Sequence, residues 1–210
     1  MKKIFLSIVI GFSCSYGMSQ RYLSHSHIGI SFGQAMTNFT FIDSDGNKAD
    51  DLKFVARNSV NFNYSYSIKN QHLLRAEIGY RGAGSRANYF DFDTEWKLNY
   101  ADFGGAYFFN ILSNDKLFLA PGIGINASFL ISGEQNIGPH KFDVRESKAF
   151  KSMDLTASAV THFRAMLTND VWFSFEYRFG YGIFNIENDV TEQTTRNLSH
   201  CALIGIGLQF

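Results

Sequence analysis

The chain has 210 residues, a length that fits one domain, and its 19 basic and 19 acidic side chains leave no net charge at neutral pH. Without a basic excess, nothing points to nucleic acid as a partner. The composition is rich in aromatic residues, with 22 Phe and 10 Tyr, and it includes 18 Gly but only two Pro. This bias favours many twisted strands over helices.

The first segment predicts a secretory signal peptide over residues 1–19. It starts with two lysines, and a short apolar run over 4–12 follows that is too short to span a bilayer. Gly17 and Ser19 are the small residues expected before cleavage at Gln20. We therefore expect residues 20–210 to form the mature domain.

The alternative, a lipoprotein with the lipid on Cys14, is disfavoured because Gly11 stands where an aliphatic residue is preferred. Cleavage removes Lys2 and Lys3, so the mature chain has 17 basic against 19 acidic side chains, a net charge near −2. Only Cys201 remains among the cysteines, so no internal disulfide is expected.

Beyond the signal peptide, side chains alternate with the period of two that is typical of strands. No apolar run there reaches 18 residues, so no membrane helix is predicted. The row of large apolar residues over 171–183 would overfill the core of a small soluble sandwich, whereas lipid accepts it. The alternation predicts eight strands, at 27–41, 53–68, 73–83, 96–110, 117–131, 152–167, 171–185 and 198–210.

The connections alternate strictly in length. Short turns are expected at 69–71, 113–115 and 168–170, and long polar loops at 43–51, 84–95, 133–151 and 187–197. This alternation is typical of membrane barrels with tight periplasmic turns and longer external loops. The predicted fold class is all-β: an eight-stranded antiparallel up-and-down transmembrane β-barrel with a filled polar interior. Both termini should lie in the periplasm.

The last strand has a sequence pattern that predicts insertion into the outer membrane. Ala202, Ile204, Ile206 and Leu208 alternate with small or polar residues, and the chain stops on Phe210. The machinery that inserts barrels into the outer membrane reads a terminal aromatic residue on such a strand as the closing strand. The expected location is the outer membrane of a Gram-negative bacterium, with lipid and this machinery as partners.

Charged residues occupy the inward positions of the predicted strands. Five are cationic and four anionic, and an eight-stranded barrel is just wide enough for side chains to fill it. Because buried charges must be paired, the near balance predicts a structural ion-pair network that plugs the lumen. The alternative is that some of these groups line a proton or ion path. With one histidine, the predicted members are Arg57, Arg75, Glu77, Arg81, Asp102, Asp154, His162, Arg164, Glu176 and Arg178.

Other inward residues predict how the lumen is packed. Phe118 and Trp172 should close the periplasmic end, and Cys201 should be a small filler. Inward glycines, Gly207 among them, are expected to make room for arginine side chains opposite. Pro121 lies within a strand and is expected to mark a bulge, since proline cannot donate a ladder hydrogen bond.

Candidate chemistry outside the lumen is sparse. The acidic loop 43–51 resembles a calcium loop, but Lys48 stands at the glycine position of an EF-hand and Phe54 at that of its closing glutamate. An ordinary hairpin loop is therefore favoured over a calcium site. The acidic group in 91–95 is expected to be a solvated loop. No catalytic set with convincing spacing is present, so neither enzymatic activity, a cofactor nor a metal is expected.

The strands resemble the PorT-like outer-membrane β-barrel family. The segment 171–186, VWFSFEYRFGYGIFNI, is similar to the penultimate strand of that family, 196–210 to its closing hairpin, and 119–124, LAPGIG, to its central strand. The resemblance covers the mature chain in size and topology. It implies an eight-stranded barrel in the outer membrane and usually no enzymatic activity. The protein that named the family takes part in protein secretion across the outer membrane.

Together these features predict a monomeric, plugged barrel with a structural or interaction role through four external loops. A second hypothesis is an accessory of protein secretion or envelope biogenesis, which would have stable protein partners. A small pore or an outer-membrane enzyme is less favoured, because the charged plug argues against conductance.

Overall fold

The computed structural model describes residues 26–49, 51–68, 71–89, 92–114, 116–188 and 193–210; the predicted signal peptide lies outside them. No helix in these ranges is long and apolar enough to cross a membrane. The described residues form ten strands: β1 (Ser26–Ile42), β2 (Val55–Ile68), β3 (His72–Tyr89), β4 (Phe92–Phe109), β5 (Leu112–Ser113), β6 (Leu117–Ile137), β7 (His140–Asp143), β8 (Met153–Met166), β9 (Val171–Gly182) and β10 (Thr194–Gln209).

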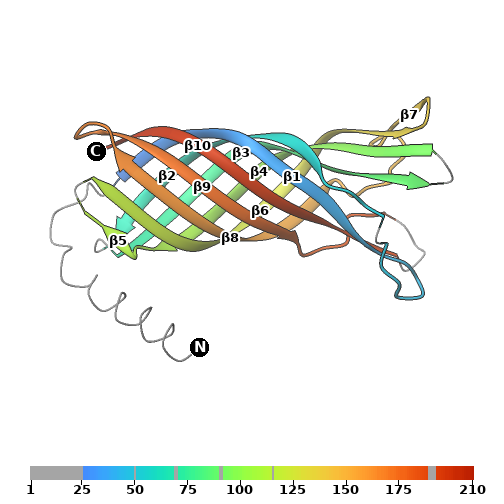
Figure 1. Ribbon diagram of the computed structural model, residues 1–210, viewed down its shortest axis with the longest axis horizontal. Coiled ribbons are helices and arrows are strands. Elements are labelled where there is room, and N and C mark those ends of the chain that lie inside the picture. The colour runs from blue at the N-terminus through green and yellow to red at the C-terminus, as the bar shows by residue number, and fades with distance from the viewer. Residues whose placement is uncertain (1–25, 50, 69–70, 90–91, 115, 189–192) are drawn as a thin grey trace.

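Eight long strands close into a ring. The order is β4-β3-β2-β1-β10-β9-β8-β6, and β4 also pairs with β6. The first and last strands pair along their whole length, from His27–Gln209 to Ile42–Thr194. Every pairing is antiparallel, and β5 and β7 are short additions beside β6. The predicted eight-stranded up-and-down barrel is confirmed. Figure 1 shows the C-terminus and β5 at one end, and β7 with the β3–β4 hairpin at the other.

The barrel is apolar outside and polar inside. Along β9, Phe173 and Phe175 are 39% and 44% exposed, whereas the intervening Ser174 and the following Glu176 are buried. The same alternation recurs on the other long strands. Because the ring is closed, its strands leave no unpaired backbone edge. A closed ring with an apolar exterior is the architecture of a transmembrane β-barrel.

Aromatic and polar side chains bracket the outer apolar band at two levels. At one level, His72 Nδ1 lies 2.6 Å from the hydroxyl of Tyr107. At the other, the Tyr80 hydroxyl donates to Asn99 Oδ1 at 2.7 Å. His72 and Tyr80 are eight residues apart on β3, which corresponds to roughly 20 Å across the membrane for a tilted strand. These two levels match the aromatic girdles at the interfaces of membrane barrels.

Two predicted loops contain strand residues, so their expected bounds were wrong. Within 84–95, β3 runs to Tyr89 and β4 starts at Phe92. The segment 133–151 holds the end of β6 and all of β7. Beyond the membrane both faces of a hairpin contact water, so the apolar alternation fades although the backbone ladder continues.

The bulge expected at Pro121 is found on one side of its strand and not on the other. Pro121 pairs in regular register with Thr161 of β8. On its other side it falls between Gly122, the last β6 residue paired with β4, and Leu119, which pairs with β5. Ala120 and Pro121 of β6 thus stand opposite the three residues 109–111, so the register shifts by one there, and the missing N–H of proline is tolerated. A second register shift lies at Asn99–Tyr100, between β4 and β6.

Candidate functional site

The lumen is the candidate site, because it collects the charged residues of the strands. Arg57, the tenth predicted lumen residue, is only partly buried. The other nine are at most 9% exposed: Arg75, Glu77, Arg81, Asp102, Asp154, His162, Arg164, Glu176 and Arg178. The structure brings them together in three groups along the barrel axis.

The central cluster joins β3 to β9 across the lumen. The guanidinium of Arg178 binds Glu77 through both Nη atoms, at 2.5 and 2.8 Å, and also donates to Glu176 Oε1 at 2.8 Å. Arg75 pairs with the other oxygen of Glu176. Asn126 of β6 donates to Glu77 at 3.1 Å. Two cations thus face two anions in a closed, charge-balanced arrangement, which is what burial of charge requires.

The end of the barrel with the long hairpins is called external and the end with the short turns periplasmic, after the orientation predicted from the sequence. The external cluster lies nearer the long hairpins. Arg81 donates to Asp102 Oδ2 and to Ser128 Oγ, each at 2.9 Å. Its guanidinium also stands 5.2 Å from the centre of the Tyr100 ring. Asp102 is therefore a paired carboxylate.

Asp154 differs from Asp102, although both are buried. Its Oδ2 accepts hydrogen bonds from Asn197 at 2.7 Å and Thr156 at 3.3 Å, while its Oδ1 has no partner. Among the described residues, no cation lies within ion-pair distance of it. Its direct hydrogen-bond donors are therefore neutral, and Arg81 acts on its charge only at longer range.

The periplasmic group is built on Arg164 without a carboxylate. Arg164 Nη1 lies 3.1 Å from His27 Nδ1, and its guanidinium stacks over Trp172 at 4.7 Å and Phe118 at 5.0 Å. His27 Nε2 in turn contacts Ser67 Oγ at 3.2 Å. His27 is not among the lumen residues predicted from the sequence. Its parity with the inward Ser31 on β1 was the available signal.

His162 is held by rings rather than by hydrogen bonds. It is 2% exposed, and its Nδ1 lies 3.2 Å from Glu176, but neither ring nitrogen makes a well-aligned hydrogen bond. The rings of Phe108, Phe118 and Trp172 surround it, with centroids 5.7 to 6.4 Å away. His162 therefore packs between the central cluster and the periplasmic end.

Arg57 is not joined to this network. Its Nε and Nη2 are buried without a hydrogen-bond partner. Its aliphatic stem lies where a side chain at Gly82 would stand. The structure therefore places Arg57 beside the ion pairs rather than within them.

Two apolar layers close the lumen above and below the charges. The periplasmic layer consists of Leu73, Ala106, Phe108, Phe118, Ala120 and Val160, with Trp172 nearby. The external layer consists of Phe39, Ala83, Leu98, Tyr100, Leu130, Val144, Phe150 and Ile186. Val144 and Phe150 come from the segment after β7, which folds back over the mouth. Phe118 and Trp172 are predicted from the sequence at the periplasmic end, but the external layer is not, because 133–151 is expected to be a long polar loop.

The space left by an inward glycine on β10 is filled by an indole, not by arginine as expected. A Cβ at Gly207 would collide with the ring of Trp172 and with the backbone oxygen of Ile28. Gly29 on β1 faces the same ring from the neighbouring strand. These two glycines admit the largest side chain of the periplasmic end.

The acidic loop after β1 is closed by its own backbone. Asp43 Oδ1 accepts the N–H groups of Asp45 and Asn47 at 2.9 and 2.8 Å, and Oδ2 accepts from the Asn47 side chain at 3.2 Å. The backbone N–H of Asn47 lowers the pKa of the Asp43 carboxyl from its ordinary value. This arrangement is an Asx turn and favours the ordinary hairpin over a calcium loop.

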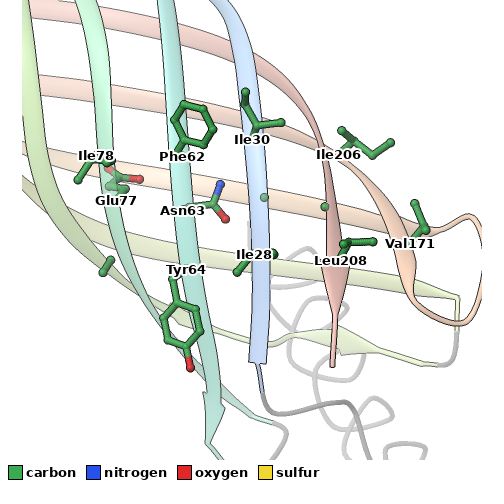
Figure 2. Close-up of a pocket in the computed structure, with 13 residues that line it drawn as sticks. Ile28, Ile30, Phe62, Asn63, Tyr64, Glu77, Ile78, Val171, Ile206 and Leu208 are labelled. Carbon is green, nitrogen blue, oxygen red and sulfur yellow. The ribbon is translucent and has the colours of Figure 1, made fainter.

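A large groove on the outer wall carries no reactive group. It measures about 820 Å³ and runs over β1, β2, β3 and β10. Figure 2 shows Ile28, Ile30, Phe62, Ile206 and Leu208 along it. Glu77, which lines it from behind the strands, is already bound to Arg178 in the lumen. The groove belongs to the apolar band that faces lipid.

The first prediction concerns the arginine that holds the central cluster. Replacing Arg178 with Ala leaves Glu77 and Glu176 buried with one cation between them, so we expect a loss of about 3–5 kcal/mol in the free energy of unfolding. Urea unfolding in detergent micelles measures this. Arg86→Ala is the control, since Arg86 is an exposed cation in a 3.8 Å contact with Glu95. Equal stability of the two variants would contradict a structural role for the cluster.

The second prediction compares the two aspartates. Asp102→Asn removes the anion that faces Arg81, and we expect it to cost about 3 kcal/mol. Asp154→Asn keeps the acceptor for Asn197 and removes a charge that has no direct ion pair and interacts with Arg81 only at longer range, so we expect a change within about 1 kcal/mol. The same unfolding assay compares both variants. A larger loss for Asp154→Asn would show that its charge is needed.

Comparisons with solved structures find similarity to several proteins at low sequence identity. The chain is similar to the outer membrane protein OprG from Pseudomonas aeruginosa, at 13% identity and a TM-score of 0.49, over 89% of this chain and 97% of that one. It is similar to the outer membrane protease OmpT from Escherichia coli, at 9% identity and a TM-score of 0.48, over 91% and 100%. It is also similar to Ail, the attachment invasion locus protein of Yersinia pestis, at 11% identity and a TM-score of 0.45, over 90% and 100%.

No family model matches the chain, and no curated protein matches it. The fold follows from the closed ladder and the inverted polarity described above. By these features the chain is an eight-stranded transmembrane β-barrel of the outer-membrane type.

Proposed function

We propose that this chain is a non-enzymatic integral protein of the outer membrane of a Gram-negative bacterium. It acts as a closed barrel that holds external hairpins for a structural or interaction role. The observation that carries the proposal is the sealed lumen, in which two apolar layers enclose an ion-paired core.

A pore needs a continuous water-filled path, and the lumen does not support one. Phe39 and Phe150 at the external mouth and Phe108 and Phe118 at the periplasmic end are at most 7% exposed. Between them the charged groups bind one another across the barrel. An ion would have to displace both apolar layers and break these pairs.

An enzyme needs an accessible set of reactive groups, and this geometry argues against one. Glu77, Glu176 and Asp102 are sealed from solvent and bound to arginines. At the external end, Glu95 contacts Lys97 at 3.2 Å and Arg86 at 3.8 Å, an arrangement of solvated surface charges. Asp91, part of the same predicted acidic group, lies outside the described residues.

The external end offers the surface for interaction. The β3–β4 hairpin and β7 project past the ring of eight strands (Figure 1). Phe92 and Phe142 on this projection are 54% and 48% exposed. Exposed aromatic residues on a rigid hairpin are suited to recognition of a protein partner.

A second candidate function is an accessory in protein secretion or envelope biogenesis, within the PorT-like family. The resemblance of 171–186 and 196–210 to that family favours it, and the same projecting surface would dock the partner. In either case Phe210, which directly follows β10, is 67% exposed and pairs with Ser26 at the rim. We propose that the insertion machinery binds this residue during assembly.

The closed lumen predicts that Cys201 is protected. This thiol faces inward on β10 and is 5% exposed. In the folded mature barrel we expect no reaction with a charged methanethiosulfonate reagent, and full reaction after denaturation. Planar bilayers holding the protein should show no stepwise conductance.

Glu146→Cys in a Cys201→Ser background is the matched control. Position 146 is exposed on the external segment, so its thiol should react in the folded state. Rapid labelling of native Cys201, together with stable conductance steps, would establish an open lumen and reject the proposal.

The native mass separates the two candidate functions. Extraction from outer membranes in mild detergent should yield a particle near the monomer mass if the barrel acts alone. A reproducible larger complex would favour the accessory role, and its other subunits would name the process. Recovery of the chain in another cell fraction would contradict the location itself.

A further inference from the structure

A small enclosed cavity lies in the middle of the lumen, between the central and external clusters. Its volume is about 20 Å³. Arg81 and Asp102 of the external cluster and Arg178 of the central cluster line it, together with Asn126 and Ser158. The cavity therefore touches both groups of ion pairs.

Five side chains around this cavity each keep one buried polar atom without a hydrogen-bond partner. Two of these atoms are donors, Arg81 Nη1 and Arg178 Nε. Two are acceptors, Asp102 Oδ1 and Asn126 Oδ1, and Ser158 Oγ can act either way. Buried polar groups of this kind are nearly always satisfied in folded proteins. Their convergence on one cavity points to a ligand that both donates and accepts.

We propose that this cavity binds one water molecule, which bridges the central and external clusters. A single water needs about 10–15 Å³ and two to four polar partners, and both conditions are met here. An anion is disfavoured by the oxygens of Asp102 and Asn126, and a cation by the two guanidinium groups. Water alone matches the mixture of donors and acceptors at this size.

The bridge has a structural consequence. Each cluster is closed within itself, and no direct hydrogen bond joins Arg178 or Glu77 to Arg81 or Asp102. A water bound to Asp102 Oδ1 and Arg178 Nε links the two into one network across the barrel.

The test is a crystal structure of the mature barrel at a resolution that shows ordered water, with Ser158→Val as the variant. In the wild type we expect a density peak about 2.7–3.2 Å from at least three of the five atoms. Valine places methyl groups in the cavity, so the peak should vanish and the midpoint of thermal unfolding should fall by a few degrees.

Ser174→Val is the matched control. Ser174 is 3% exposed in the same lumen, on β9, but does not line the cavity. This variant should keep the peak. If Ser158→Val does not fold, Ser158→Ala replaces it and should retain the peak with one contact fewer.

Two outcomes would overturn the proposal. Absence of wild-type density, with Asp102 and Arg178 paired directly, would show that the side chains fill the cavity themselves. An anomalous peak in crystals soaked in bromide would show that an anion occupies the cavity instead of water.

Discussion

The pairing of β1 with β10 is the constraint on which the rest of the structure depends. It joins the two ends of the sheet over sixteen residue pairs and leaves no open edge in the ring of eight strands. Only a closed ring satisfies its backbone without help from water, and so only a closed ring can carry Phe, Ile and Leu on its outer face. The side chains are therefore apolar on the outer face, which contacts lipid, and polar or charged on the inner face, which does not.

Closure in turn determines how the interior is filled. Eight strands leave a lumen that side chains fill apart from the small cavity beside Arg81 and Arg178, so each inward charge needs a partner within reach. Arg178 meets this need by bridging two glutamates, and Arg81 by binding Asp102. Arg164 has no carboxylate, and the faces of Trp172 and Phe118 supply the compensating contact. The aromatic residues at the periplasmic end therefore both seal the lumen and stabilise a cation.

Much of this fold could be predicted from the sequence, because period-two alternation reports directly which face a residue occupies. Parity placed Glu77, Arg178 and Trp172 inside. It could not say that Arg178 reaches Glu77 across the barrel, 101 residues away, because that contact depends on the side-chain conformation and on the register of all strands between them. The external layer was missed because Val144 and Phe150 stand in a segment without alternation. The space beside Gly207 was expected to hold an arginine, whereas the Trp172 ring fills it. The sequence alone does not show which side chain from the opposite wall packs against a glycine.

A sealed and internally balanced interior restricts where function can reside. Groups that bind one another across the lumen cannot at the same time bind a solute, and apolar layers at both ends keep solutes away from them. The lipid face is occupied by the membrane. The surfaces that remain are the external projection, with Phe92 and Phe142 exposed on a rigid ladder, and the periplasmic rim, where the turns are short. Since the stability of the barrel comes from its interior, the projection can vary in sequence without loss of the fold, and specificity for a partner is therefore most readily carried there.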